Sequence, residues 1–61
     1  MTGHRTATGH IPAARAVSWG CLCGLAEVWD YAPSTPPEWA VRLMAVRAAD
    51  HRFLARLKET T

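Results

Sequence analysis

Both cysteines of the chain lie in residues 19–24, where a single leucine separates Cys21 from Cys23. Two thiolates this close together can bind one zinc ion, which takes sulfur and imidazole nitrogen ligands in a tetrahedron. Two further ligands are then needed, and histidines stand on both sides of the cysteine pair. The spacing therefore predicts half of a zinc site in this segment.

The histidines supply the other half of the expected site. His51 is the preferred third ligand because it falls in a predicted helix, at the edge of an apolar stripe, and zinc fingers commonly take a ligand from a helix. His10 is the expected fourth ligand, with His4 on the same segment as the alternative. The predicted ligands of Zn²⁺ are therefore Cys21, Cys23, His51 and His10.

Two other interpretations of the cysteine pair stay open at this point. Free cysteines are often small buried hydrophobic residues, and Cys21 and Cys23 could fill that role in a strand. A dithiol that cycles with a disulfide is the other interpretation. It is less favoured, because side chains two residues apart on a strand are separated by two rises of about 3.3 Å, near the upper limit for a disulfide.

The length of the chain limits what it can do. It has 61 residues and a net charge of +2. Below about 70–80 residues a single core rarely supplies more than ~3–5 kcal/mol, so small domains add a metal, disulfides or a partner. The sequence contains no nucleophile with an evident base and no phosphate loop, and it is too short for a large cleft. We therefore expect neither an enzyme nor a small-molecule substrate, and a structural zinc with all four positions filled by protein.

No segment of the sequence is expected to span a membrane. The neutral stretch between Arg15 and Glu27 is shorter than the roughly 20 residues that a transmembrane helix needs. The same stretch has the outline of a secretory leader, with basic residues before it and the small Ala26 at its end. Trp19 and two glycines make it a poor apolar segment, so a cytoplasmic protein is the preferred interpretation.

Two strands are expected after a flexible N-terminal arm. Residues 1–12 are rich in Thr, Gly and His and are assigned to the arm, and residues 13–61 to a single domain. Apolar residues then alternate through Val17, Trp19 and Cys21, which indicates a strand. Gly24 favours a tight turn, and residues 25–31 are rich in strand-forming side chains. The pattern predicts a β-hairpin.

A long helix should follow the proline-rich loop of residues 32–37. Thr35 and Glu38 have the spacing of a capping box, and Pro36 suits the first helical position. Strong helix formers continue to about Glu59 without a break. The predicted fold is therefore α+β, a ββα unit in which a β-hairpin packs on one long C-terminal helix.

One apolar stripe of this helix is expected to cover the hairpin. Asp50 falls in the middle of the stripe, so a buried hydrogen bond is expected for its carboxylate, unless the helix is rotated enough for it to reach water. The stripe consists of Trp39, Leu43, Val46, Phe53, Leu54 and Leu57.

The motif Trp19-x-Cys21-x-Cys23-Gly24, with a histidine before it and another on an Ala- and Arg-rich helix after it, resembles small proteins of actinobacteria and their phages that are thought to bind zinc. The resemblance covers most of the chain after His10. It implies a site of two cysteines and two histidines, namely the four ligands predicted above, and adds little about function.

A protein partner or a homodimer is the preferred binding function. Trp29 and Tyr31 are typical interface anchors, and they precede the proline-rich loop. The alternative is a nucleic acid bound through Arg42, Arg52 and Arg56 on the helix. The first turn of the helix lacks the residue types that read bases, which argues against sequence-specific recognition by that route.

Overall fold

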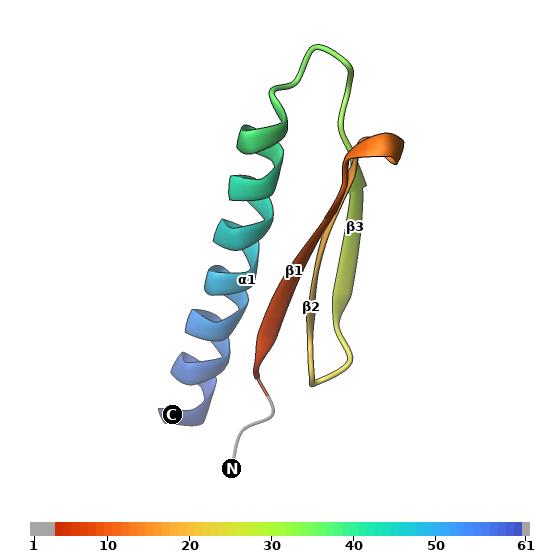
Figure 1. The fold of residues 1–61 in the computed structure, drawn as a ribbon. Helices are drawn as coiled ribbons and strands as arrows, with labels where there is room; N and C mark the ends of the chain where they lie inside the picture. Colours follow the sequence, from red (N-terminus) through yellow and green to blue (C-terminus); the bar gives the residue numbers. More distant parts are fainter. Residues whose placement is uncertain (1–3, 61) are drawn as a thin grey trace.

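A computed structural model describes residues 4–60 of the protein, and it has the predicted α+β architecture. An antiparallel sheet in the order β1-β2-β3 lies against one long C-terminal helix, α1 (Figure 1). The elements are β1 (Thr6–Ile11), a 3-10 turn (Pro12–Ala14), β2 (Ala16–Cys21), β3 (Ala26–Asp30) and α1 (Pro37–Thr60). No helix within residues 4–60 has the length and apolar character needed to cross a membrane.

The predicted hairpin is confirmed, and its turn is built as the sequence indicates. β2 and β3 pair antiparallel, with Trp19 opposite Glu27. The Cys21 N–H donates to the Leu25 carbonyl at 2.8 Å, and Gly24 adopts a φ of 105°. Residues with a Cβ rarely adopt this conformation, so glycine is needed at that point.

The sheet has a third strand that the sequence analysis placed in a flexible arm. Residues 6–11 form β1, which pairs with β2 from Thr6 opposite Cys21 to Ile11 opposite Ala16. The first three residues of the expected arm lie outside the described part of the chain. β1 escapes a search for apolar alternation because the residues it turns toward the helix, on the face shared with Trp19, are threonines and histidine.

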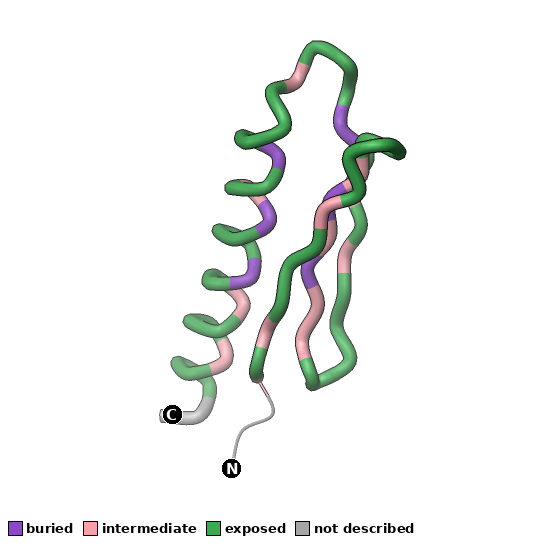
Figure 2. The backbone as a smooth tube through the Cα atoms, in the orientation of Figure 1, coloured by how far each residue is buried: buried purple, intermediate pink, exposed green. Residues whose placement is uncertain are grey.

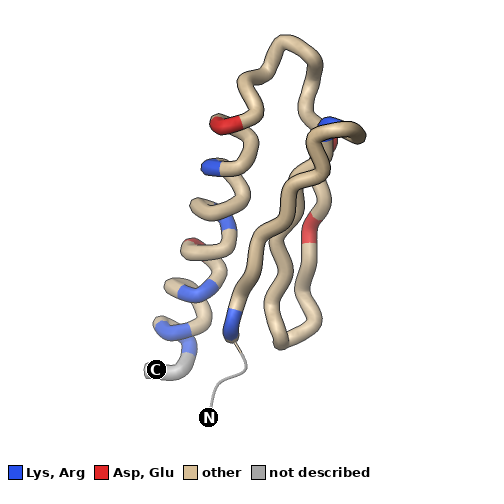
Figure 3. Tube along the Cα trace, viewed as in Figure 1, with Lys and Arg blue, Asp and Glu red and all other residues tan. Residues whose placement is uncertain are grey.

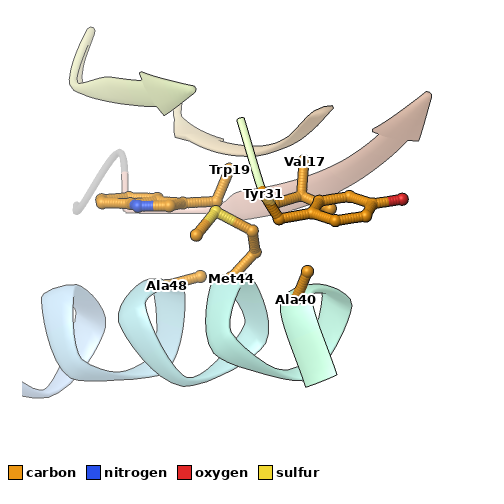
Figure 4. Packing of buried hydrophobic residues seen from close by; sticks show 6 residues of the cluster. All are labelled: Val17, Trp19, Tyr31, Ala40, Met44 and Ala48. Carbon is orange, nitrogen blue, oxygen red and sulfur yellow. The ribbon is translucent and has the colours of Figure 1, made fainter. Parts of the chain in front are cut away.

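The core lies between β2 and the first half of α1. Val17 and Trp19 of β2 and Tyr31 after β3 are buried against α1 (Figures 2 and 4). The helix contributes a narrow row to this core, made of Ala40, Met44 and Ala48. Small side chains on the helix leave room for the two large rings on the sheet. This core is too small to stabilise the domain by much on its own.

The expected packed face of the helix was wrong. Five residues of the predicted stripe are exposed, and only Leu43 is partly buried against the core. Asp50 is also exposed, so the expected buried hydrogen bond of its carboxylate is wrong as well. The exposed residues of the stripe are Trp39, Val46, Phe53, Leu54 and Leu57. The helix packs through alanines because the sheet already fills the space with Trp19 and Tyr31.

This packing predicts opposite results for two truncations on α1. Met44→Ala removes a side chain that is 2% exposed and should lower the free energy of unfolding by about 2–5 kcal/mol. Val46→Ala changes an exposed side chain and should stay within about 0.5 kcal/mol of the parent. Urea denaturation of the zinc-loaded protein measures both. A larger loss for Val46→Ala would mean that the predicted stripe is the packed face after all.

Candidate metal centre

Four side chains with metal-binding atoms meet at the end of the sheet where β2 turns into β3. His4 precedes β1, Cys21 ends β2, Cys23 lies in the turn, and His51 belongs to α1. One ligand atom from each of these residues lies within 4.8 Å of every other. The cluster therefore draws on the N-terminal segment, the hairpin and the helix together, and it can hold a metal ion.

Three of the six separations between ligand atoms in the cluster match the edges of a zinc tetrahedron. Zn–N bonds of about 2.0–2.1 Å and Zn–S bonds of about 2.3 Å imply edges of about 3.3 Å between two nitrogens and about 3.6 Å between nitrogen and sulfur. His4 Nδ1 lies 3.3 Å from His51 Nε2. Cys21 Sγ lies 3.6 Å from His4 Nδ1, and Cys23 Sγ lies 3.4 Å from His51 Nε2. These atoms therefore suit coordination of one ion, and two sulfurs with two nitrogens are a donor set typical of zinc.

Strand register decides which N-terminal histidine joins the cluster. Thr6 lies opposite Cys21, and the Leu22 N–H donates to the Arg5 carbonyl at 3.0 Å, which continues the pairing toward His4. His4 therefore reaches the cysteines. It is the histidine that the sequence analysis named as the alternative to His10.

His10, the expected fourth ligand, lies elsewhere. It pairs with Val17, six residues or roughly 20 Å farther along the sheet from His4. Its Nε2 lies 2.8 Å from the Tyr31 hydroxyl oxygen. This histidine therefore has a hydrogen-bonding role at the far end of the core, and the structure groups His4 with Cys21, Cys23 and His51 instead.

The metal cluster sits at the surface rather than in the core. Cys23 is exposed, whereas His4, Cys21 and His51 are partly buried. An ion held there would be shielded by the helix and the sheet on one side and open to solvent at the turn. Chelators in solution should therefore reach it.

A series of side-chain contacts restricts the orientation of the His51 ring. The Trp19 ring packs against the His51 ring with centroids 5.2 Å apart. The Trp19 indole N–H donates to Glu27 Oε1 at 2.7 Å, and Glu27 also accepts two hydrogen bonds from Arg47, at 2.6 and 3.0 Å. Arg47 lies one turn before His51 on α1. These contacts fix the orientation of the Trp19 ring, and the ring in turn limits how the imidazole can tilt.

Glu27 is held in its charged form by this arrangement. Hydrogen bonds from Arg47 and then from Trp19 lower the pKa of Glu27 from 4.5 to about 2. The same carboxylate raises the pKa of Arg47 above its usual value. Sequence analysis assigned no role to Glu27. Its only signal is its place opposite Trp19 in the hairpin, which becomes visible once the strand register is known.

The other predicted site residues lie outside the cluster. Tyr31 is buried, so it offers no surface to a partner, and Trp29 is partly buried with its ring against Trp39 at 5.8 Å. Arg52 is exposed and donates a hydrogen bond to Thr6 Oγ1. Arg42 and Arg56 are likewise exposed on α1. Basic residues gather along α1 and at the start of β1 (Figure 3).

Comparison with known proteins gives no relative for this chain. No protein-family model, no curated protein and no solved structure matches it. The resemblance to actinobacterial and phage proteins therefore rests on the sequence motif alone, and the metal centre rests on its geometry.

The register of β1 predicts different effects for the two histidines. His4→Gln removes a ligand and should weaken zinc binding by at least about tenfold, as measured by competition with a chromophoric chelator. His10→Gln should leave zinc affinity unchanged and cost about 0.5–1.5 kcal/mol of stability, because only the hydrogen bond with Tyr31 is lost. The reverse result, with affinity lost in His10→Gln alone, would contradict the ligand set.

Glu27 supplies a prediction with a defined pH dependence. The pKa of Glu27 is lowered in the folded state. Its contribution to the stability of the fold is therefore complete above about pH 4.5 and disappears as the pH falls toward about 2. Glu27→Gln should therefore lower the melting temperature by the same amount at pH 8 and at pH 6. Asp30→Asn, which alters an exposed carboxylate on the same strand, should cause a smaller change. A Glu27→Gln effect that varied between pH 8 and 6 would contradict this assignment.

Proposed function

We propose that the protein is a small binding module stabilised by one zinc ion, held by His4, Cys21, Cys23 and His51. The observation that carries this proposal is the agreement between the nitrogen and sulfur separations in the cluster and the edges of a zinc tetrahedron. The role is structural rather than catalytic, because four protein ligands fill the tetrahedron and leave no position for a reacting water.

The energetic reason for a metal is the size of the core. Six of the residues whose burial is described form the core, and the helix supplies mainly alanines to it. Structural zinc in finger peptides contributes apparent binding energies of roughly 10–16 kcal/mol, much of which is folding energy. An ion joining the N-terminal segment, the hairpin and α1 would therefore supply more stability than the apolar contacts between them.

A protein partner is the binding function that the surface supports best. Several large apolar side chains of α1 are exposed, which is typical of interaction sites. The alternative of nucleic-acid binding through Arg42, Arg52 and Arg56 has less support. Arg52 is engaged with Thr6, and the helix begins with Pro37 and Glu38, which do not contact phosphates favourably.

The zinc proposal predicts that folding depends on both thiolates. Cys21→Ser or Cys23→Ser should abolish cooperative thermal unfolding, because the remaining core is too small. A chelator added to the parent protein should do the same, and native mass spectrometry should find one zinc per chain. Leu22→Ser is the matched control, since its side chain is exposed between the two cysteines. Unchanged circular dichroism and melting of the metal-free protein would contradict a structural role for zinc.

A further inference from the structure

Helix α1 carries a second apolar row, which lies beside the face that packs on the sheet. Its members are spaced by four and three residues in turn, which is the a and d pattern of a coiled-coil heptad. We call this row the seam, and it consists of Trp39, Leu43, Val46, Asp50, Phe53 and Leu57. Met44 and Ala48, which pack on the sheet, occupy other heptad positions. One helix therefore has a narrow row for its own core and, beside it, a bulkier row whose apolar members other than Leu43 are exposed.

The seam is exposed over most of its length. Val46 is 58% and Phe53 is 59% exposed, and Trp39 at its N-terminal end is 51% exposed. Nineteen residues of helix, from position 39 to 57, extend for about 27 Å. A shallow groove beside it is lined by Leu25 and Leu54, so the apolar surface continues from the helix toward the hairpin turn. Figure 2 shows the side of α1 away from the sheet as exposed as far as the burial of the helix is described.

The charges that flank the seam indicate what kind of helix can pair with it. In coiled coils the e and g positions beside the seam set partner choice. Every charged residue at these positions is basic, namely Arg42, Arg47 and Arg56. Arg47 is paired with Glu27, so the charge offered to a partner comes from the exposed Arg42 and Arg56. A second copy would bring Asp50 against Asp50 in a parallel pair and Arg42 against Arg56 in an antiparallel pair. Like charges at facing positions oppose pairing, so a copy of this chain is a poor partner and an acidic helix is a good one.

We propose that the seam binds an amphipathic helix of another protein, whose apolar stripe is flanked by glutamate and aspartate. Asp50 lies within the seam, where a single polar residue fixes the register of a helix pair at some cost in affinity. The partner should therefore present asparagine or lysine opposite Asp50. This inference rests on the proposed function in one respect, because zinc keeps the helix in place on the sheet.

The test uses the zinc-loaded full chain and a synthetic peptide of about three heptads. The peptide carries leucine at a and d, one asparagine to face Asp50, and glutamate at e and g, which also discourages pairing of the peptide with itself. Fluorescence anisotropy of the labelled peptide should show saturable binding. Val46→Asp and Phe53→Asp should each weaken that binding by about tenfold or more. Ala45→Asp, on an exposed position outside the seam, is the matched control and should change it much less.

Several results would overturn the proposed seam. Equal binding of a scrambled peptide of the same composition would show that charge alone attracts it, and equal binding of a peptide with lysine at e and g would remove the role of the arginines. A stable dimer of the protein in sedimentation, or tighter binding of duplex DNA than of the peptide, would replace the proposed partner. Absence of peptide binding by zinc-loaded protein contradicts the seam alone, whereas failure to load zinc contradicts the metal centre.

Discussion

The pairing of β1 with β2 in a single register is the constraint on which the metal centre depends. Thr6 opposite Cys21 brings His4 to the cysteines, and the hairpin turn and α1 bring the other ligands to the same place. A slip of one residue would turn His4 to the other face of the sheet, and a slip of two would move it by about 6.6 Å. The first slip would remove His4 from the face of the cluster, and the second exceeds the 4.8 Å within which the ligand atoms lie. A bound metal ion and strand pairing would therefore stabilise each other.

Helix α1 and the sheet divide the volume of the core unequally. Trp19 and Tyr31 fill most of the core volume from the side of the sheet. The helix contributes Ala40 and Ala48 on either side of Met44. Alanines let the helix approach the rings closely and cost little conformational entropy, but they bury little apolar area. Most of the large apolar side chains of α1 are exposed instead. A metal ion bound by His4, Cys21, Cys23 and His51 would add stability that this core does not supply.

The hairpin, the helix and the cysteine pair could be predicted because each has a strong local signal: alternation through Val17 and Trp19, proline before a run of helix formers, and two thiolates beside Gly24. Strand β1 and the choice of His4 over His10 could not. The side chains that β1 turns toward the helix are polar, so the strand has no apolar pattern. His4 and His10 are separated by an even number of residues, so alternation places both on the same face. Only the pairing register separates them, and register is a property of the folded sheet.

The rotation of α1 could not be predicted for a different reason, and that reason clarifies what the metal does. A helix with two apolar faces can cover a sheet in two ways, and Val46 and Met44 lie about 160° apart around its axis. Hydrophobicity alone favours burial of the bulkier seam. His51 lies on the same side as Met44 and Ala48, so its bond to a metal shared with Cys21 and Cys23 would hold the narrow face inward. The ion would then determine which face of α1 meets the sheet and which is presented to solvent.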